Sequence, residues 1–114
     1  MNTEWKIKFV NAKAEEELLS LSADLKAKFL HVTEMIMAFG PHNVGLPHVR
    51  PLENKLWELR LKGKDNIARS IYVLASGRKL VILRTFIKKT QKTQKTPPSE
   101  FKIAYTRLKE VKDD

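Results

Sequence analysis

The part of the chain best suited to chemistry is the basic segment from Arg84 to Lys95. It contains five lysine or arginine residues and no acid, and threonine and glutamine residues lie between the lysines that follow Ile87. Ammonium and guanidinium groups bind phosphate oxygens, and hydroxyl and amide groups add further hydrogen-bond donors. Because this segment directly follows an apolar strand pattern, it predicts a cationic rim that faces a polyanion, with RNA as the favoured candidate.

Two arginines lie in segments with strand patterns. Residues 56–61 alternate apolar and polar side chains, so Arg60 and Glu58 are expected on the open face of a sheet. Arg69 lies among apolar residues within residues 67–74, where a cation needs an acidic partner or a cleft that a ligand also reaches. An ion pair is the structural alternative for each: a surface pair for Arg60, and a buried pair with Glu58 for Arg69.

The lysines that follow Ile87 are candidates for proton transfer. Neighbouring cations lower each other's pKa, so one of the clustered lysines could transfer protons. The alternative is that residues 88–95 are only a solvated connection.

The three histidines have no second ligand at the spacing of a metal site, so we expect neither a metal ion nor a cofactor. His48 could approach the sheet from a loop. Nucleotide-binding glycine loops and nucleophile elbows are absent.

Composition places these residues in one small domain. The chain has 114 residues, 42% of them hydrophobic, which predicts a single domain over residues 1–114. It contains no cysteine, signal-peptide pattern or membrane-spanning apolar stretch, so a soluble cytoplasmic protein is expected. Residues 1–54 hold six lysines and arginines against seven acids, whereas residues 55–114 hold sixteen against six. The second half therefore favours an acidic partner.

The periodicity of apolar residues predicts an α+β fold. Strand patterns cover residues 5–9, 56–61, 67–74 and 79–87, and short turns between the last three predict an antiparallel meander. Asn11 is expected to cap a first helix, which a break near Ser20 or Ser22 separates from a second helix with an apolar stripe ending at Phe39. Residues 41–51 contain three prolines and are expected to form a loop. A final helix opens at Pro97, with Thr96 as its cap. The predicted order is β-α-α-β-β-β-α, a mainly antiparallel sheet with helices packed on one face.

Three segments together resemble a known family. They are Leu-Trp-Glu-Leu-Arg at residues 56–60, Ile-Ala-Arg-Ser-Ile-Tyr at residues 67–72, and Phe-Ile-Lys-Lys-Thr-Gln-Lys-Thr at residues 86–93. With these segments the chain resembles the HigB branch of the RelE toxin superfamily, a branch also described as phage-derived Gp49-like. The likeness extends over nearly the whole chain, to residue 108. It implies a RelE-like fold and a toxin of a type II toxin–antitoxin pair.

The resemblance also implies roles for individual residues. The family directs two strand arginines at the scissile phosphate, and Arg60 and Arg69 match them. Lys89 and Lys92 match part of its basic motif after the last strand. These four residues are the catalytic candidates. Substrate contacts are expected from four others: Lys55, Lys88, Gln91 and Lys95. The best-studied relatives carry a tyrosine or a histidine–acid pair near the last strand. Here Phe86 and lysines occupy that region, so a lysine is the candidate for proton transfer.

The activity implied by the resemblance is cleavage of mRNA in the ribosomal A site without a metal ion. The expected partners are mRNA on the ribosome and a cognate, HigA-like antitoxin with a helix-turn-helix domain, through which the complex would bind operator DNA. No membrane partner is expected. The alternative is a non-catalytic module that binds RNA, the ribosome or DNA together with such a partner. A third interpretation is a structural protein whose basic face binds an acidic protein.

Overall fold

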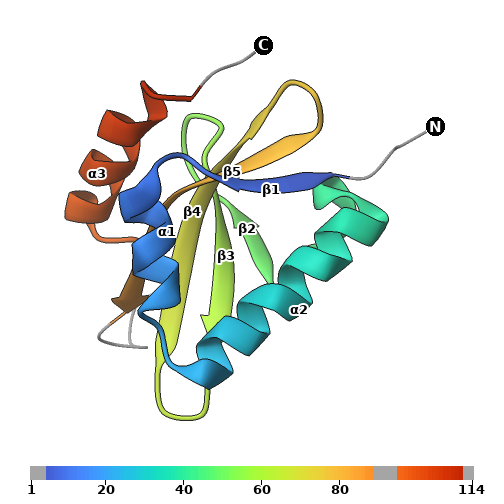
Figure 1. The fold of residues 1–114 in the computed structure, drawn as a ribbon, viewed down its shortest axis with the longest axis vertical. Coiled ribbons are helices and arrows are strands. Elements are labelled where there is room, and N and C mark those ends of the chain that lie inside the picture. Colours follow the sequence, from blue (N-terminus) through green and yellow to red (C-terminus); the bar gives the residue numbers. More distant parts are fainter. Residues whose placement is uncertain (1–4, 89–94, 112–114) are drawn as a thin grey trace.

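The described residues form a five-stranded mixed sheet and three α-helices, which confirms the α+β class (Figure 1). The computed structural model describes residues 5–88 and 95–111. Across the sheet, the strands lie in the order β1-β5-β4-β3-β2. In chain order the elements are β1 (Lys6–Phe9), α1 (Ala12–Leu19), α2 (Ala23–Phe39), the 3-10 helix η1 (Pro41–Asn43), β2 (Val49–Pro51), β3 (Trp57–Lys62), β4 (Ile67–Ala75), β5 (Lys79–Lys88) and α3 (Pro98–Leu108).

The antiparallel meander expected from the short turns is present. Strands β2 to β5 pair with their neighbours in antiparallel register, whereas β1 pairs with β5 in parallel at the other edge. The central strands β4 and β5 are those whose sequences are apolar on both faces, as a sheet covered on both sides requires. No helix within the described residues is both long enough and apolar enough to cross a membrane.

Helices α1 and α2 connect β1 to the meander and cover one face of the sheet. The side-chain oxygen of Asn11 accepts a hydrogen bond from the Ala14 backbone N–H at 2.9 Å, so the predicted cap of α1 is confirmed. The predicted break is also present, because α1 ends at Leu19 and Ser22 precedes α2. At the far end of α2, Gly40 has φ +88°, a conformation that ends the helix and that glycine adopts readily.

Helix α3 packs against the opposite face, so the expectation that all helices lie on one face is wrong. The neighbours Ile71 and Tyr72 in β4 point to opposite sides of the sheet. Tyr72 belongs to the core beneath α2, whereas Ile71 joins a second core with Ala104 and Phe101 of α3. The second core forms because α3 carries its own apolar side, which needs an apolar sheet surface to cover it.

Three local predictions need correction. The loop expected at residues 41–51 contains η1 and the short edge strand β2, where Pro51 is tolerated because an edge strand need not donate every N–H. Phe39, the end of the predicted apolar stripe, was expected to be buried, but it is 66% exposed. Thr96 does not cap α3: Pro97 is the capping residue, and the Thr96 hydroxyl donates to a sheet carboxylate instead.

Glu17 of α1 connects three elements through ion pairs. Its carboxylate accepts hydrogen bonds from Arg84 of β5 at 2.6 Å and from both terminal nitrogens of Arg107 of α3 at 2.8 Å. Arg84 also donates to Glu100 of α3 at 2.6 Å. Arg84 is the first residue of the basic segment for which the sequence predicted polyanion binding. These contacts instead give it a structural role, since it holds α1 and α3 to β5.

We expect Glu17→Gln to lower the free energy of unfolding by about 2 kcal/mol at neutral pH, since it weakens hydrogen bonds to two charged partners. Partial burial tends to raise the pKa of Glu17. The hydrogen bonds from Arg107 and from the Thr85 backbone N–H, together with the charges of Arg84 and Arg107, outweigh burial and hold the pKa below its ordinary value of 4.5. Urea denaturation at a series of pH values measures the effect.

The sign of the pH dependence follows from that lowered pKa. A carboxylate whose pKa is lower in the folded state contributes stability that is fully present above pH 4.5 and is lost as pH falls through the folded-state value. The variant should therefore approach the wild type in stability as the solution is acidified. Glu16→Gln, an exposed neighbour, is the matched control and should behave like the wild type at every pH. A constant difference between Glu17→Gln and the wild type at all pH values would contradict the prediction.

A candidate polyanion-binding site on the charged part of the sheet

The sheet face that carries α3 is apolar under the helix and charged beyond it. Leu56 and Ile71 pack against α3, and further along β3 and β4 the same face presents Glu58, Arg60 and Arg69. Alternation along the strands produces this division, since residues two apart share a face. The charged part of the face is the candidate site.

Arg60 and Arg69 lie directly opposite each other in the antiparallel pair of β3 and β4. Their Cβ atoms are therefore about 5 Å apart, a spacing at which like charges repel. Arg69 is only 5% exposed. Burial lowers the pKa of its guanidinium, as do the nearby charges of Arg60 and Arg50, while Glu58 raises it. Two cations held this close to each other are typical of an anion-binding site.

Glu58 is the fully buried carboxylate at the centre of this group. Its Oε1 accepts a hydrogen bond from the Thr96 hydroxyl at 3.1 Å, and its Oε2 lies 3.6 Å from Nε of Arg69 and 4.0 Å from Nη1 of Arg50. Neither Oε2 of Glu58 nor Nε of Arg69 has a hydrogen-bond partner among the described residues. The buried pair proposed from sequence as the structural alternative for Arg69 is thus present. We call Arg50, Arg60, Arg69 and Glu58 the arginine cluster.

The predicted lysines are distributed unevenly around the arginine cluster. Lys88 ends β5 opposite Ile67, on the same sheet face as Arg69, and is 6% exposed. Lys95 lines a cavity together with Arg50. Lys55 is not brought to the cluster: it lies in the hairpin between β2 and β3, with φ +66°, at the end of β3 far from Arg60. Three predicted residues, Lys89, Gln91 and Lys92, lie outside the described residues.

Sequence reasoning missed Arg50 and gave Thr96 a different role. Arg50 belongs to the strand that was expected to be a loop, and it pairs in register with Glu58. The alternation Val49-Arg50-Pro51, with Val49 buried, was a weak signal for that strand. Nothing in the sequence indicated that Thr96 would reach Glu58, because the two residues are far apart along the chain.

His48 does not reach the charged face. Its backbone carbonyl accepts from the Arg60 N–H at 2.8 Å, but its ring packs edge-on against His31 of α2, with centroids 6.3 Å apart. Burial lowers the pKa of His48, and the charges of Lys28 and His31 lower it further. Within residues 5–88 and 95–111, no three histidine, aspartate or glutamate side chains converge to hold a metal ion.

The two described tyrosines are also engaged away from the arginine cluster. Tyr72 lies in the core beneath α2, where burial raises the pKa of its hydroxyl, and Tyr105 of α3 donates to Glu53 at 2.9 Å. A tyrosine acid in the cluster is therefore not available from residues 5–88 and 95–111.

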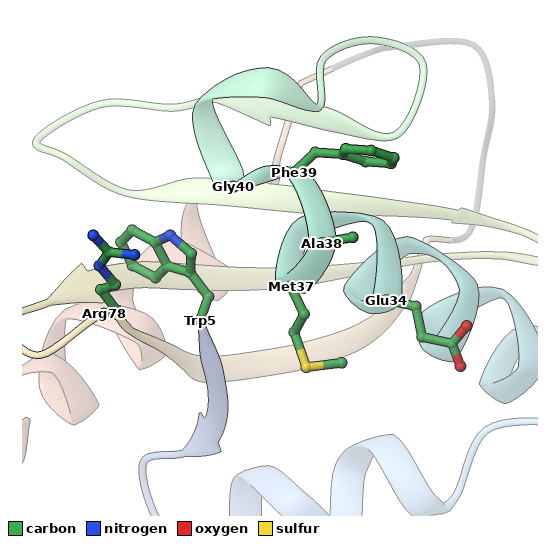
Figure 2. A pocket seen from close by; sticks show the side chains of 7 residues that line it. All are labelled: Trp5, Glu34, Met37, Ala38, Phe39, Gly40 and Arg78. Carbon is green, nitrogen blue, oxygen red and sulfur yellow. The ribbon is translucent and has the colours of Figure 1, made fainter. Parts of the chain in front are cut away.

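A second cavity, with a volume of about 450 Å³, lies at the C-terminal end of α2 (Figure 2). Its lining combines one cation and one acid with apolar residues. In Figure 2 the guanidinium of Arg78 lies beside the indole of Trp5, whereas Phe39 and Glu34 point away from them. This cavity does not share a lining residue with the arginine cluster, so it offers positions for control substitutions.

The fold and the charged face together define a class of protein: a small α+β domain with a RelE-like arrangement of strands and a cationic sheet surface. The phage-derived Gp49-like family matches residues 16–109, and the chain belongs to that family. It is a family of RelE-like toxins, related to toxins that are ribonucleases, so membership in a toxin–antitoxin system and an antitoxin partner follow at the family level. Among curated proteins, none matches the chain.

Proposed function

We propose that this protein is a metal-independent endoribonuclease, the HigB-like toxin of a type II toxin–antitoxin pair, which cuts mRNA on the ribosome and so inhibits translation. The observation that carries the proposal is the opposed pair of arginines, Arg60 and Arg69, on the sheet face that carries α3, where Arg69 is almost fully buried and Arg60 is partly exposed. Guanidinium groups remain charged and grip phosphate through two donors. Family membership supports the same conclusion.

The proposed reaction is attack of a ribose 2′-hydroxyl on the adjacent phosphorus. A base removes the 2′-hydroxyl proton, the P–O5′ bond breaks, and an acid protonates the leaving 5′ oxygen. The products are a 2′,3′-cyclic phosphate and a 5′-hydroxyl. Arg60 and Arg69 would stabilise the additional negative charge of the pentacovalent phosphorus, the role of fixed donors in an oxyanion hole.

The lysines would supply proton transfer and further phosphate contacts. Lys88 is held at the end of β5 on the face that carries Arg69. We assign proton transfer to a lysine of residues 88–92, with Lys89 and Lys92 as the candidates, and substrate contacts to Lys88, Gln91 and Lys95. Glu58 would position Arg69 and Arg50 rather than touch RNA, because its side chain is completely buried.

The proposed partners follow from the reaction and the charge. The substrate is mRNA on the ribosome, in the cytoplasm. The inhibitor is an antitoxin with a helix-turn-helix domain and acidic residues, through which the complex would bind operator DNA. The excess of lysine and arginine in residues 55–114 suits both an RNA and an acidic antitoxin segment.

The second candidate function is a non-catalytic module that binds RNA, the ribosome or DNA together with its partner. The burial of Arg69 and its ion pair with Glu58 favour this alternative, since a neutralised, buried guanidinium is less available to phosphate. Electrostatic binding needs only the exposed cations.

Substitution of Arg60 tests the enzymatic function with little risk to the fold, since this side chain is only partly buried. We expect Arg60→Gln to lower the yield of newly cut mRNA about 10- to 100-fold, because one fixed cation at the phosphate is lost. The measurement is sequencing of RNA with 5′-hydroxyl ends after brief induction of each variant. Arg78→Gln removes an arginine at the second cavity and is the matched control, expected to cut like the wild type.

The two functions give opposite results in this experiment. New 5′-hydroxyl ends that depend on Arg60 and not on Arg78 support the ribonuclease. Growth arrest without new ends, equal for the wild type and Arg60→Gln, would reject the ribonuclease and leave the binding module. Cleavage that is equally strong in Arg60→Gln would remove Arg60 from the site.

A further inference from the structure

A second binding element adjoins the arginine cluster. A cavity of about 520 Å³ lies between the end of β2 and the start of α3. Pockets that bind small ligands commonly have volumes of this order and combine apolar walls with a few polar groups. Four apolar side chains form part of its lining: Pro51, Leu52, Pro98 and Phe101. The lining also holds two cations, Arg50 and Lys95, and one acid, Glu53, whose carboxylate accepts a hydrogen bond from Tyr105. The excess of positive charge and the apolar wall suit a flat, partly apolar group attached to a phosphate.

The cavity and the arginine cluster share Arg50 and are linked through Glu58. Arg50 and Thr96 line the cavity, and both contact the Glu58 carboxylate, whose Oε2 lies 3.6 Å from Arg69 on its other side. Because Arg50 pairs directly with Glu58 in the sheet, Arg60 is its diagonal neighbour, about 7–8 Å away. One nucleotide can therefore reach from the cavity to Arg60 and Arg69.

We propose that this cavity binds the base of the nucleotide next to the phosphate that Arg60 and Arg69 hold, an inference that rests on the proposed function. The base would lie against Phe101 and the neighbouring apolar side chains, a mode of contact that tolerates different bases because each has an aromatic face. Arg50 and Lys95 would hold the phosphates on either side of that nucleotide. An acidic antitoxin peptide is the competing occupant.

The test compares binding of two fluorescent oligoribonucleotides to the full chain, one intact and one with an abasic ribose at a single central position. Both carry 2′-deoxyribose at the scissile position, so neither can be cut. Fluorescence anisotropy should show about tenfold tighter binding of the intact RNA by the wild type. Phe101→Leu keeps an apolar side chain in the core but removes the aromatic face. It should reduce that preference to about twofold while the abasic RNA binds as before.

The control is Phe39→Leu, the same substitution at the second cavity, which should leave the preference for the intact RNA unchanged. Pro98→Trp, a bulky change at an exposed lining position, should also abolish the preference by filling the cavity. Thermal unfolding of each variant, followed by circular dichroism, checks that the fold is retained. Should Phe101→Leu unfold, Pro98→Trp still decides the question.

The outcomes separate this inference from the proposed function. Equal binding of intact and abasic RNA by the wild type overturns the base site, even if induced cells show new 5′-hydroxyl ends. A preference for intact RNA that depends on Phe101, without any new ends, supports the base site and rejects the nuclease. Loss of antitoxin affinity in Pro98→Trp, with an unchanged base preference, would assign the cavity to the protein partner and overturn the inference.

Discussion

Glu58→Leu is expected to lower the free energy of unfolding by about 3–5 kcal/mol, because it leaves the buried guanidinium of Arg69 without its carboxylate. The substitution also removes the acceptor of the Thr96 hydroxyl, which holds the segment before α3 against β3. Arg50 is less affected, since its side chain is 30% exposed and can turn toward water. Urea denaturation followed by tryptophan fluorescence gives the free energy directly.

The double variant Glu58→Leu with Arg69→Met is the control for that prediction. Apolar residues of similar volume often replace a buried ion pair without loss of stability, so the double variant should recover most of the free energy lost in Glu58→Leu. If the double variant is no more stable than Glu58→Leu, the loss comes from packing or from Thr96, and the ion pair is not its cause.

Loss of the Arg69 guanidinium is expected to lower the rate of RNA cleavage about 10²- to 10³-fold, the effect of removing one donor from a preorganised anion site. The double variant is the suitable protein for this measurement, because it removes Arg69 without leaving Glu58 buried and unpaired. The measurement is single-turnover cleavage of mRNA on programmed ribosomes. Arg69→Lys, which keeps the charge but loses the two-donor fork, should be intermediate.

The comparison of stability with cleavage separates the two roles of Arg69. A double variant that is stable but inactive, together with partial activity of Arg69→Lys, in which Glu58 is retained, places Arg69 at the phosphate during the reaction. A double variant that is stable and fully active would make Arg69 a structural cation, and Arg60 would then be the remaining strand arginine at the site. Proteins with equal circular dichroism spectra are required for either conclusion, so that unfolding is not mistaken for lost chemistry.

The sequence predicted those parts of the fold that depend on local patterns. Alternation placed Arg60 and Glu58 on one face of β3, and short turns gave the antiparallel meander. Asn11 marked the start of α1 because capping depends on a few adjacent residues. The class of the fold and the strand positions of Arg60 and Arg69 were therefore readable from the chain alone.

Contacts between distant parts of the chain could not be predicted from local sequence patterns. The position of α3 on the second face depends on which apolar faces meet after folding. Arg84 belonged to a basic segment by composition, yet Glu17 and Glu100 from distant parts of the chain bind it. Lys55 was expected near Arg60 because it precedes the same strand. In the structure it lies in the hairpin between β2 and β3, at the end of β3 that is distant from Arg60.

By itself, the sequence determined that two strand arginines and a lysine-rich segment exist and that the chain can form one small sheet. Only the tertiary structure decided that Arg50, Arg69 and Thr96 meet around the buried carboxylate of Glu58. The physical reason is the range of the interactions. Strand alternation and helix capping act over a few residues, whereas burial of Glu58 requires cations and a hydroxyl that are brought together only when the strands and the segment before α3 have packed.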